Sequence, residues 1–279
     1  MINLGNIIFH GDRNKKQVAL TFDDSPSEET SKILNLLKKE KIMATFFVIG
    51  RKTFGREKII RRIINEGHEI GNHSYSHKKL LFIGYKSVKE EIAKCDRLLR
   101  DKFNLKTNLF RPPYFKFGLN AWIASFKLKK RVIFADVVSE DWKLKGIDFA
   151  VYNVLKRVRN CSIINLHDYL EDIGRNKQIV KITKEIISRL KSKKYNFVTV
   201  SKTLNLDFLN LETSSKTSAW PNSAALQQYL LRPKSVRTFP ASSPAVVRFL
   251  YSSQSCPIGF PHPKHLTGII MLILSFDRF

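Results

Sequence analysis

Two adjacent carboxylates, Asp23 and Asp24, follow the apolar residues 18–20 and stand just before a Ser-Pro turn. Carboxylates at the end of a buried strand repel each other and lose hydration, so they need a cation, a proton or strong hydrogen-bond donors. The alternative is that one of them caps the helix that follows, because acidic caps after strands are common. The pair by itself therefore favours a functional site and a structural cap equally.

Two histidines, His73 and His77, add nitrogen ligands four positions apart. In a helical turn they would face the same side and could share one metal ion. Together with a carboxylate at the same edge of a sheet, they predict an Asp-His-His site for a catalytic divalent metal, with positions left for water and substrate. Zinc (Zn2+) is expected first, although such ligands also suit Co2+, Ni2+, Fe2+ and Mn2+.

Further reactive side chains follow later strand-like segments. Arg111 precedes two prolines that stiffen the turn, so its guanidinium could orient a carboxylate and the backbone N–H of Tyr114 could stabilise an oxyanion. His167, followed by an aspartate, could act as a general acid, and Trp142, next to Asp141, could wall a pocket. Each has a structural explanation when taken singly, but their joint occurrence at strand ends favours a functional site.

The elements that must position these side chains can be predicted from hydrophobic periodicity. Strands are expected at residues 18–22, 44–49, 68–71, 109–110, 132–135, 163–166 and 197–200. Helices are expected at 26–40, 57–66, 87–102, 119–126, 149–158 and 178–191, the first with Ser25 as its N-cap. This alternation predicts an α/β fold with a parallel sheet, doubly wound or closed into a barrel, and with its chemistry at the carboxyl ends of the strands.

The chain is strongly basic. Its 279 residues carry a formal net charge of +25, from 49 lysines and arginines against 24 acidic residues. Such a field attracts polyanions, for example nucleic acid or anionic cell-wall polymers. The basic residues are spread through helix-like segments, and no aromatic-rich basic face of the kind that binds single-stranded nucleic acid is evident. We therefore expect attraction to anionic polymers without specific nucleic-acid recognition.

The composition changes near residue 210. Residues 210–279 hold seven of the ten prolines and eleven serines, and the alternation of strands and helices stops there. We therefore predict a catalytic unit at 1–209 and a non-globular, low-order Ser/Pro-rich C-terminal extension of unknown role at 210–279. Alternative explanations of the extension are a small binding module and a reading-frame error or fusion in the parent gene.

The first residues lack the basic region and long apolar run of a secretion signal. The chain as written is therefore expected in the cytoplasm, or secreted and associated with the cell wall if the true start lies upstream. The longest apolar run, residues 269–274, is too short for a transmembrane helix, which takes about 20 residues. No transmembrane segment is expected.

Five motifs in this order resemble those of the polysaccharide deacetylase family, the NodB-homology domain of carbohydrate esterase family 4. They are Thr-Phe-Asp-Asp-Ser-Pro at 21–26, His-Ser-Tyr-Ser-His at 73–77, Arg-Pro-Pro-Tyr at 111–114, Asp-Trp at 141–142 and Leu-His-Asp at 166–168. The resemblance covers roughly residues 7–205. It implies a distorted (β/α)7 TIM-like barrel and metal-dependent removal of acetyl groups from amino sugars.

The resemblance also implies which residues hold the metal and which one is the base. Asp23 falls on the catalytic base of the family. Asp24, His73 and His77 fall on its metal ligands, in agreement with the Asp-His-His site expected from the residue types.

The remaining motifs imply supporting roles. Arg111 and Asp141 fall on the pair that tunes and orients the base, and His167 falls on the general acid. Tyr114 would supply an oxyanion N–H, and Trp142 would line the acetyl pocket.

Three positions depart from the family pattern. Ser25 replaces a glycine, and Val138 stands where many members carry an acidic residue, although Asp136 is close by. Asn165 replaces an apolar residue, usually leucine, that helps form the pocket for the acetyl methyl group, so the acyl preference is left open.

The predicted function is metal-dependent hydrolysis of N-acetyl groups, or alternatively O-acetyl groups, of an amino-sugar polymer such as peptidoglycan or a chitin-like oligosaccharide, with release of acetate. One alternative is a metal-dependent hydrolase of a small acylamine or cyclic amide. A second, from another class, is a non-catalytic polyanion-binding protein. The natural polymer and the oligomeric state are left open.

Overall fold

The computed structural model describes residues 6–170, 174–175, 177–204, 248–249 and 272–273. The predicted boundary at residue 209 lies outside the described residues. So does the predicted extension at 210–279, apart from the paired two-residue strands β12 (Arg248–Phe249) and β13 (Leu272–Ile273). The predicted alternation of strands and helices falls within residues 6–204.

The main sheet has nine strands, and their pairing is parallel throughout. The strands are β1 (Ile7–Ile8), β2 (Gln17–Ser25), β3 (Thr45–Val48), β4 (Glu69–Asn72), β5 (Leu109–Phe110), β6 (Arg131–Ile133), β7 (Val137–Val138), β8 (Ser162–His167) and β11 (Asn196–Phe197). They are ordered β1-β6-β5-β4-β3-β2-β8-β7, with β11 beside β2. β2, which pairs with β3, β8 and β11, carries the two adjacent carboxylates at its carboxyl end.

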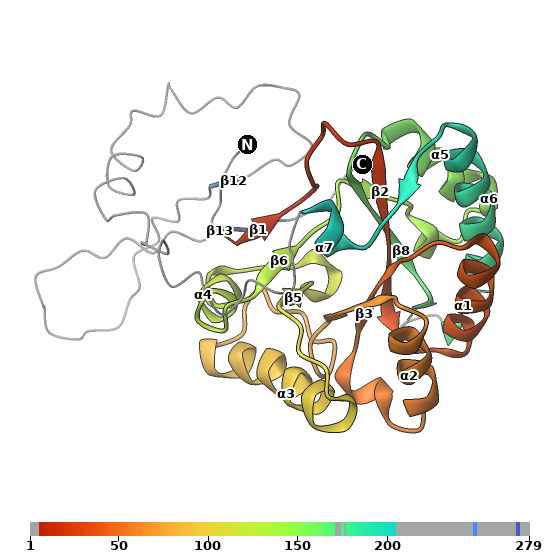
Figure 1. Ribbon diagram of the computed structural model, residues 1–279. Helices are drawn as coiled ribbons and strands as arrows, with labels where there is room; N and C mark the ends of the chain where they lie inside the picture. Colours follow the sequence, from red (N-terminus) through yellow and green to blue (C-terminus); the bar gives the residue numbers. More distant parts are fainter. Residues whose placement is uncertain (1–5, 171–173, 176, 205–247, 250–271, 274–279) are drawn as a thin grey trace, which may run out of the picture.

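The sheet curls into an incomplete barrel. β6 lies near one end of the strand order and β7 lies at the other, yet only residues 134–136 separate them in the chain. This segment therefore brings the two edges of the sheet together, and the strands enclose an interior (Figure 1). The predicted distorted (β/α)7 barrel is confirmed. A small antiparallel hairpin, β9 (Tyr169–Leu170) with β10 (Gly174–Arg175), follows β8.

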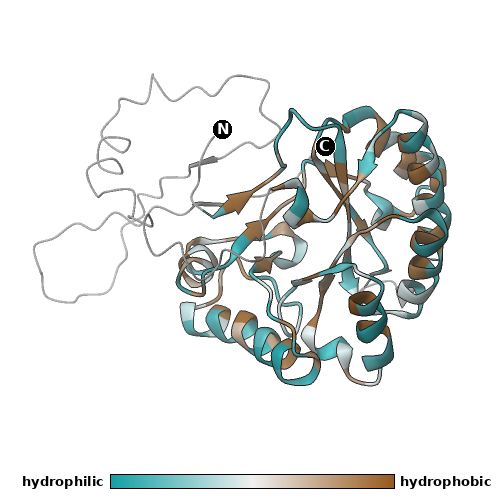
Figure 2. Ribbon diagram, viewed as in Figure 1, coloured by the Kyte–Doolittle hydropathy of each residue, from teal (hydrophilic) through white to brown (hydrophobic). Residues whose placement is uncertain are grey.

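Helices surround the barrel on its outside, with their hydrophobic faces turned toward the sheet (Figures 1 and 2). They are α1 (Glu28–Glu40), α2 (Glu57–Asn65), α3 (Tyr85–Phe103), α4 (Leu119–Lys127), α5 (Ile147–Arg157), α6 (Ile179–Ser192) and the short α7 (Val200–Thr203). The 3-10 turns are η1 (Gly50–Thr53), η2 (Pro113–Phe115) and η3 (Asp141–Lys143). Within the described part of the chain, no helix is both long and apolar enough to cross a membrane.

Alternation along β2 separates the two sides of the barrel wall. Val18, Leu20 and Phe22 pack outward into the core formed with α1 and α6. Ala19, on the other face, packs with Phe47 and other apolar residues of neighbouring strands. Successive side chains of a strand point to opposite faces, so Thr21 and Asp23 follow Ala19 into the barrel interior. The apolar layer below and the polar residues above place the chemistry at the carboxyl end of the barrel.

The start of α1 differs from the prediction. The N-cap is Ser27, whose hydroxyl accepts from the backbone N–H groups of Glu29 and Thr30, while Thr30 completes the capping box. Ser25 still belongs to β2, and its hydroxyl donates to Asp168 at 2.7 Å. A serine that ends a strand and bonds to the neighbouring chain segment cannot also cap the helix, so the helix begins two residues later.

Candidate active site

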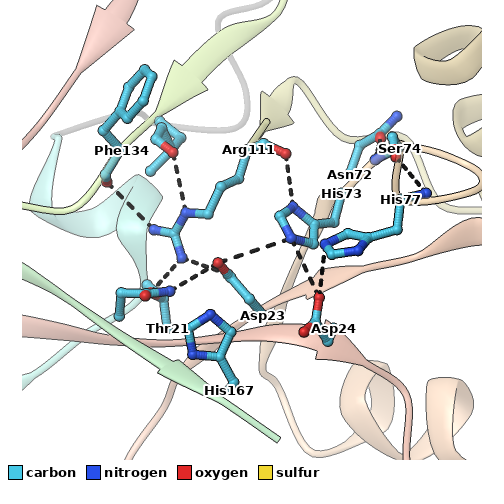
Figure 3. A network of polar contacts seen from close by, with 12 residues as sticks. Thr21, Asp23, Asp24, Asn72, His73, Ser74, His77, Arg111, Phe134 and His167 are labelled. Carbon is cyan, nitrogen blue, oxygen red and sulfur yellow. Dashed lines mark hydrogen bonds and ion pairs between the residues drawn. The ribbon is translucent and has the colours of Figure 1, made fainter. Parts of the chain in front are cut away.

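The two adjacent carboxylates point in different directions because the backbone changes at Asp24. Its φ of 67° lies in the left-handed region, and the register between β2 and β3 shifts between Phe22 and Ser25. Such a bulge re-aims the side chain that it carries. Asp23 consequently faces Arg111 in the barrel interior, whereas Asp24 faces the two histidines (Figure 3).

Asp24, His73 and His77 converge on one point. Oδ1 of Asp24 lies 3.1 Å from Nε2 of His77 and 3.6 Å from Nε2 of His73, and the three candidate ligand atoms lie within 4.8 Å of one another. All three residues are buried. Among the described residues, no donor with hydrogen-bond geometry reaches Oδ1 of Asp24. A cation would satisfy this buried oxygen, so the residues present fit a divalent metal.

The charge states of these residues also suit a metal. Burial lowers the pKa of His73 to about 4, so its imidazole is neutral at pH 7. Burial raises the pKa of Asp24, but His77, together with His167 and His73, outweighs this effect and holds that pKa well below its usual range. A neutral imidazole and an ionised carboxylate are the forms in which these side chains bind metals.

The histidine pair is held in a loop, which differs from the predicted helical turn. Ser74 and His77 have φ values of 65° and 62°, and no helix includes residues 73–77. Nδ1 of His73 donates to the carbonyl oxygen of Arg111 at 2.8 Å, which leaves the Nε2 lone pair for a metal. The backbone N–H of His77 donates to the hydroxyl of Ser74 at 3.0 Å. The left-handed backbone therefore brings the imidazoles together without helical periodicity.

Asp23 receives a donor on each carboxylate oxygen. Nη1 of Arg111 donates to Oδ1 at 2.7 Å, and Nδ2 of Asn165 donates to Oδ2 at 2.8 Å. Both donors are fully buried, and Asp23 itself is 3% exposed. The site therefore holds this carboxylate in one orientation. The sequence connected Asn165 with the acyl pocket, and the structure shows that its amide bonds to Asp23.

Arg111 is held from several sides. Besides Asp23, it donates to the hydroxyl of Thr21 at 2.7 Å and to the carbonyl oxygen of Ile133 at 3.1 Å. Its guanidinium also lies 3.9 Å from the ring centroid of Phe47. Thr21 is a site residue that the sequence motifs did not indicate. The signal was present, since Thr21 stands two positions before Asp23 and must face the same side of the strand.

Asp141 contacts His167, and this differs from the expected pairing with the base. Oδ1 of Asp141 lies 2.9 Å from Nδ1 of His167, and Oδ2 accepts from the backbone N–H of His167 at 3.0 Å. The hydroxyl of Ser139, a residue that sequence analysis missed, donates to Oδ1 at 2.9 Å. The pair that sequence analysis assigned to the base is thus divided: Arg111 orients Asp23, and Asp141 orients His167.

Two aromatic residues stand at the edge of the site. Tyr114 is 40% exposed, and its ring centroid lies 4.6 Å from that of His77. Trp142 is 36% exposed and meets His167 edge to face at 5.2 Å. Both lie where a substrate could reach them. That the backbone N–H of Tyr114 stabilises an oxyanion and that Trp142 lines the acetyl pocket stay predictions.

Asp136 lies away from these groups. It pairs with Arg13 at 2.7 Å and accepts from Ser162, at the opposite end of β8 from His167. It therefore does not replace the acidic residue that the family pattern has at Val138. Its contacts stabilise the end of the barrel opposite the site.

The pair of Asp141 and His167 predicts a change in pH dependence. Burial lowers the pKa of His167, but the Asp141 carboxylate, with smaller contributions from Asp24 and Asp23, outweighs burial and raises that pKa to about 9. A general acid must be protonated, so activity should fall as the pH rises through about 9. In Asp141→Asn, only the Asp24 and Asp23 carboxylates still oppose the effect of burial, so the pKa of His167 should fall and the alkaline limb of kcat/KM should move to lower pH.

The measurement is kcat/KM against pH for both proteins with metal in excess. Asp148→Asn, an exposed carboxylate on α5, is the matched control and should keep the wild-type profile. Superimposable alkaline limbs in wild type and Asp141→Asn would contradict the role of His167 as the acid.

Comparison with known proteins agrees with this geometry. The family model described as polysaccharide deacetylase matches residues 10–132. The chain is also 35% identical over 193 residues to a peptidoglycan-N-acetylglucosamine deacetylase of Bacillus cereus, which covers 69% of this chain and 70% of that protein. The chain belongs to the polysaccharide deacetylase family. Three further curated relatives are longer, and the chain spans 35% to 39% of their length.

Solved structures of polysaccharide deacetylases share the fold. A crystal structure of a peptidoglycan N-acetylglucosamine deacetylase superimposes with a TM-score of 0.69 at 33% identity, over 72% of this chain and 94% of that one. A pseudoenzyme of the family from Bacillus anthracis gives a TM-score of 0.66 at 25% identity, over 74% of this chain and 71% of that one. Because the fold also occurs in a pseudoenzyme, the side chains of the site, and not the fold, indicate activity.

Proposed function

We propose that this chain hydrolyses N-acetyl groups of an amino-sugar polymer, such as peptidoglycan or a chitin-like oligosaccharide, and releases acetate. The observation that carries the proposal is the convergence of Asp24, His73 and His77 directly beside Asp23, with His167 on the adjacent strand. The names of the relatives, which are deacetylases of peptidoglycan amino sugars, support the substrate class.

The metal that the ligand set favours is zinc, because one carboxylate and two imidazoles with no sulfur form a common catalytic zinc site. When bound to Asp24, His73 and His77, the metal supplies a Lewis acid that polarises the acetyl carbonyl and makes water easier to deprotonate.

The protein side chains then divide the proton transfers. Asp23, oriented by Arg111 and Asn165, accepts the proton of the water that attacks the acetyl carbonyl. His167, kept protonated by Asp141, donates a proton to the leaving amine so that acetate and the free amino sugar separate.

The proposal is tested by measuring acetate from chitooligosaccharides, peptidoglycan and small amides side by side. Acetate should appear from at least one amino-sugar polymer, disappear after chelation and return with added zinc. Turnover of small amides alone would favour the hydrolase of a small acylamine or cyclic amide. Salt-sensitive binding of polyanions with no metal-dependent turnover would favour the non-catalytic alternative.

A further inference from the structure

The loop that carries both histidines has an unfavourable backbone. Ser74 and His77 are non-glycine residues in the left-handed region, and such residues persist only where their surroundings hold them. The positions of both imidazoles depend on this loop, so whatever holds it also determines how well the site binds a metal. Two backbone hydrogen bonds to the loop come from η1, donated by Gly50 and Arg51, and three further hydrogen bonds come from the middle of α3.

Glu91 of α3 makes three hydrogen bonds to the loop. Its Oε2 accepts from the backbone N–H of Ser76 at 2.8 Å, and its Oε1 accepts from the Ser76 hydroxyl at 2.7 Å. Its backbone carbonyl accepts from the N–H of Tyr75 at 3.0 Å. The carboxylate is only 11% exposed. Both carboxylate oxygens of Glu91 thus accept hydrogen bonds from Ser76, the residue directly before His77. The carboxylate is largely buried, and hydrogen bonds to an ionised acceptor are strong.

Asn72 holds the other end of the loop against the same helix. Its Oδ1 accepts from the backbone N–H of Ser74 at 2.7 Å. Its Nδ2 donates to the carbonyl oxygen of Ile92 at 2.9 Å and to Oδ1 of Asp96 at 2.8 Å. Asn72 is fully buried, and Asp96 in turn pairs with Lys130 at 2.7 Å. Residues 91–96 of α3 therefore clamp the loop at both ends.

We propose that Glu91 is a positioning residue for the metal site and that the clamp formed with Asn72 and Asp96 sets the affinity for the metal. The inference rests on the metal site of the proposed function but not on its substrate. Glu91 touches none of the candidate ligands, and it acts by holding Ser76 and therefore His77. Substitution of partners that orient metal ligands typically lowers metal affinity about 10- to 100-fold.

The test compares zinc dissociation constants measured by competition with a chelating dye. Glu91→Gln loses one acceptor without changing size and should weaken zinc binding about 10-fold, and Glu91→Ala should weaken it more. Excess zinc should restore kcat in both variants. Glu90→Gln is the matched control, because Glu90 precedes Glu91 on α3, is exposed and pairs with Arg97 outside the loop. It should bind zinc like the wild type.

A second route keeps the test informative if Glu91→Ala fails to fold. Ser76→Ala removes the hydroxyl partner and should weaken zinc binding by a similar factor. The double variant Ser76→Ala with Glu91→Gln should lose less zinc-binding free energy than the two single variants lose together, because both changes remove the same contact. Wild-type zinc affinity in Glu91→Gln and Ser76→Ala would overturn the inference while leaving the proposed function intact. Zinc binding without acetate release by the wild type would contradict the proposed function and leave the inference standing.

Discussion

Replacement of Asp23 by asparagine should abolish acetate release while the protein keeps its metal. Asp23 is not one of the three residues whose ligand atoms converge, and its oxygen nearest to Nε2 of His73 lies 4.0 Å from that atom. Asparagine has the same shape and can still accept from Arg111, but it cannot take up a proton at neutral pH. General bases contribute about 100- to 10,000-fold to rate, so kcat should fall by about this factor. Elemental analysis should find the wild-type metal content.

Two companion variants separate binding from proton transfer. His167→Ala should also lose acetate release with metal retained, because His167 is outside the convergent set. Asp24→Asn should lose the metal itself, since its carboxylate belongs to that set. Turnover close to wild type in Asp23→Asn would contradict the assignment of Asp23 as the base, and the same result in His167→Ala would contradict the assignment of His167 as the acid.

Arg111→Met should destabilise the fold as well as the site. The guanidinium is fully buried and pairs at 2.7 Å with Asp23, which is itself buried. Removing one partner of a buried ion pair leaves an uncompensated charge and costs about 3–5 kcal/mol. For a domain of this size, about 3 °C of Tm corresponds to each kcal/mol, so Tm should fall by about 10 °C. Thermal unfolding monitored by circular dichroism measures this shift.

The double variant Arg111→Met with Asp23→Asn is the control for this explanation. It removes both charges, so it should recover a large part of the lost stability even though it stays inactive. A double variant as unstable as the sum of the single changes would show that packing of the arginine, and not its charge, supports the barrel.

The order of the elements could be predicted from the sequence. Periodic apolar residues and turn residues act over short distances, so they show in local patterns. The predicted strand 163–166 became β8 (Ser162–His167), and the predicted helix 87–102 became α3 (Tyr85–Phe103). The parallel barrel followed from this alternation, and the convergence of Asp24, His73 and His77 followed from the rule that strand ends share one edge.

Only the tertiary structure decided how the site residues pair. The contact of Asn165 with Asp23 spans 142 positions, and that of Asp141 with His167 spans 26. Both depend on which strands are neighbours and on their register, which a single sequence does not show. The left-handed backbone at Asp24 and the loop before His77 are likewise imposed by contacts with distant elements. The sequence alone determined which groups are available for the chemistry, whereas long-range packing determined which group orients which.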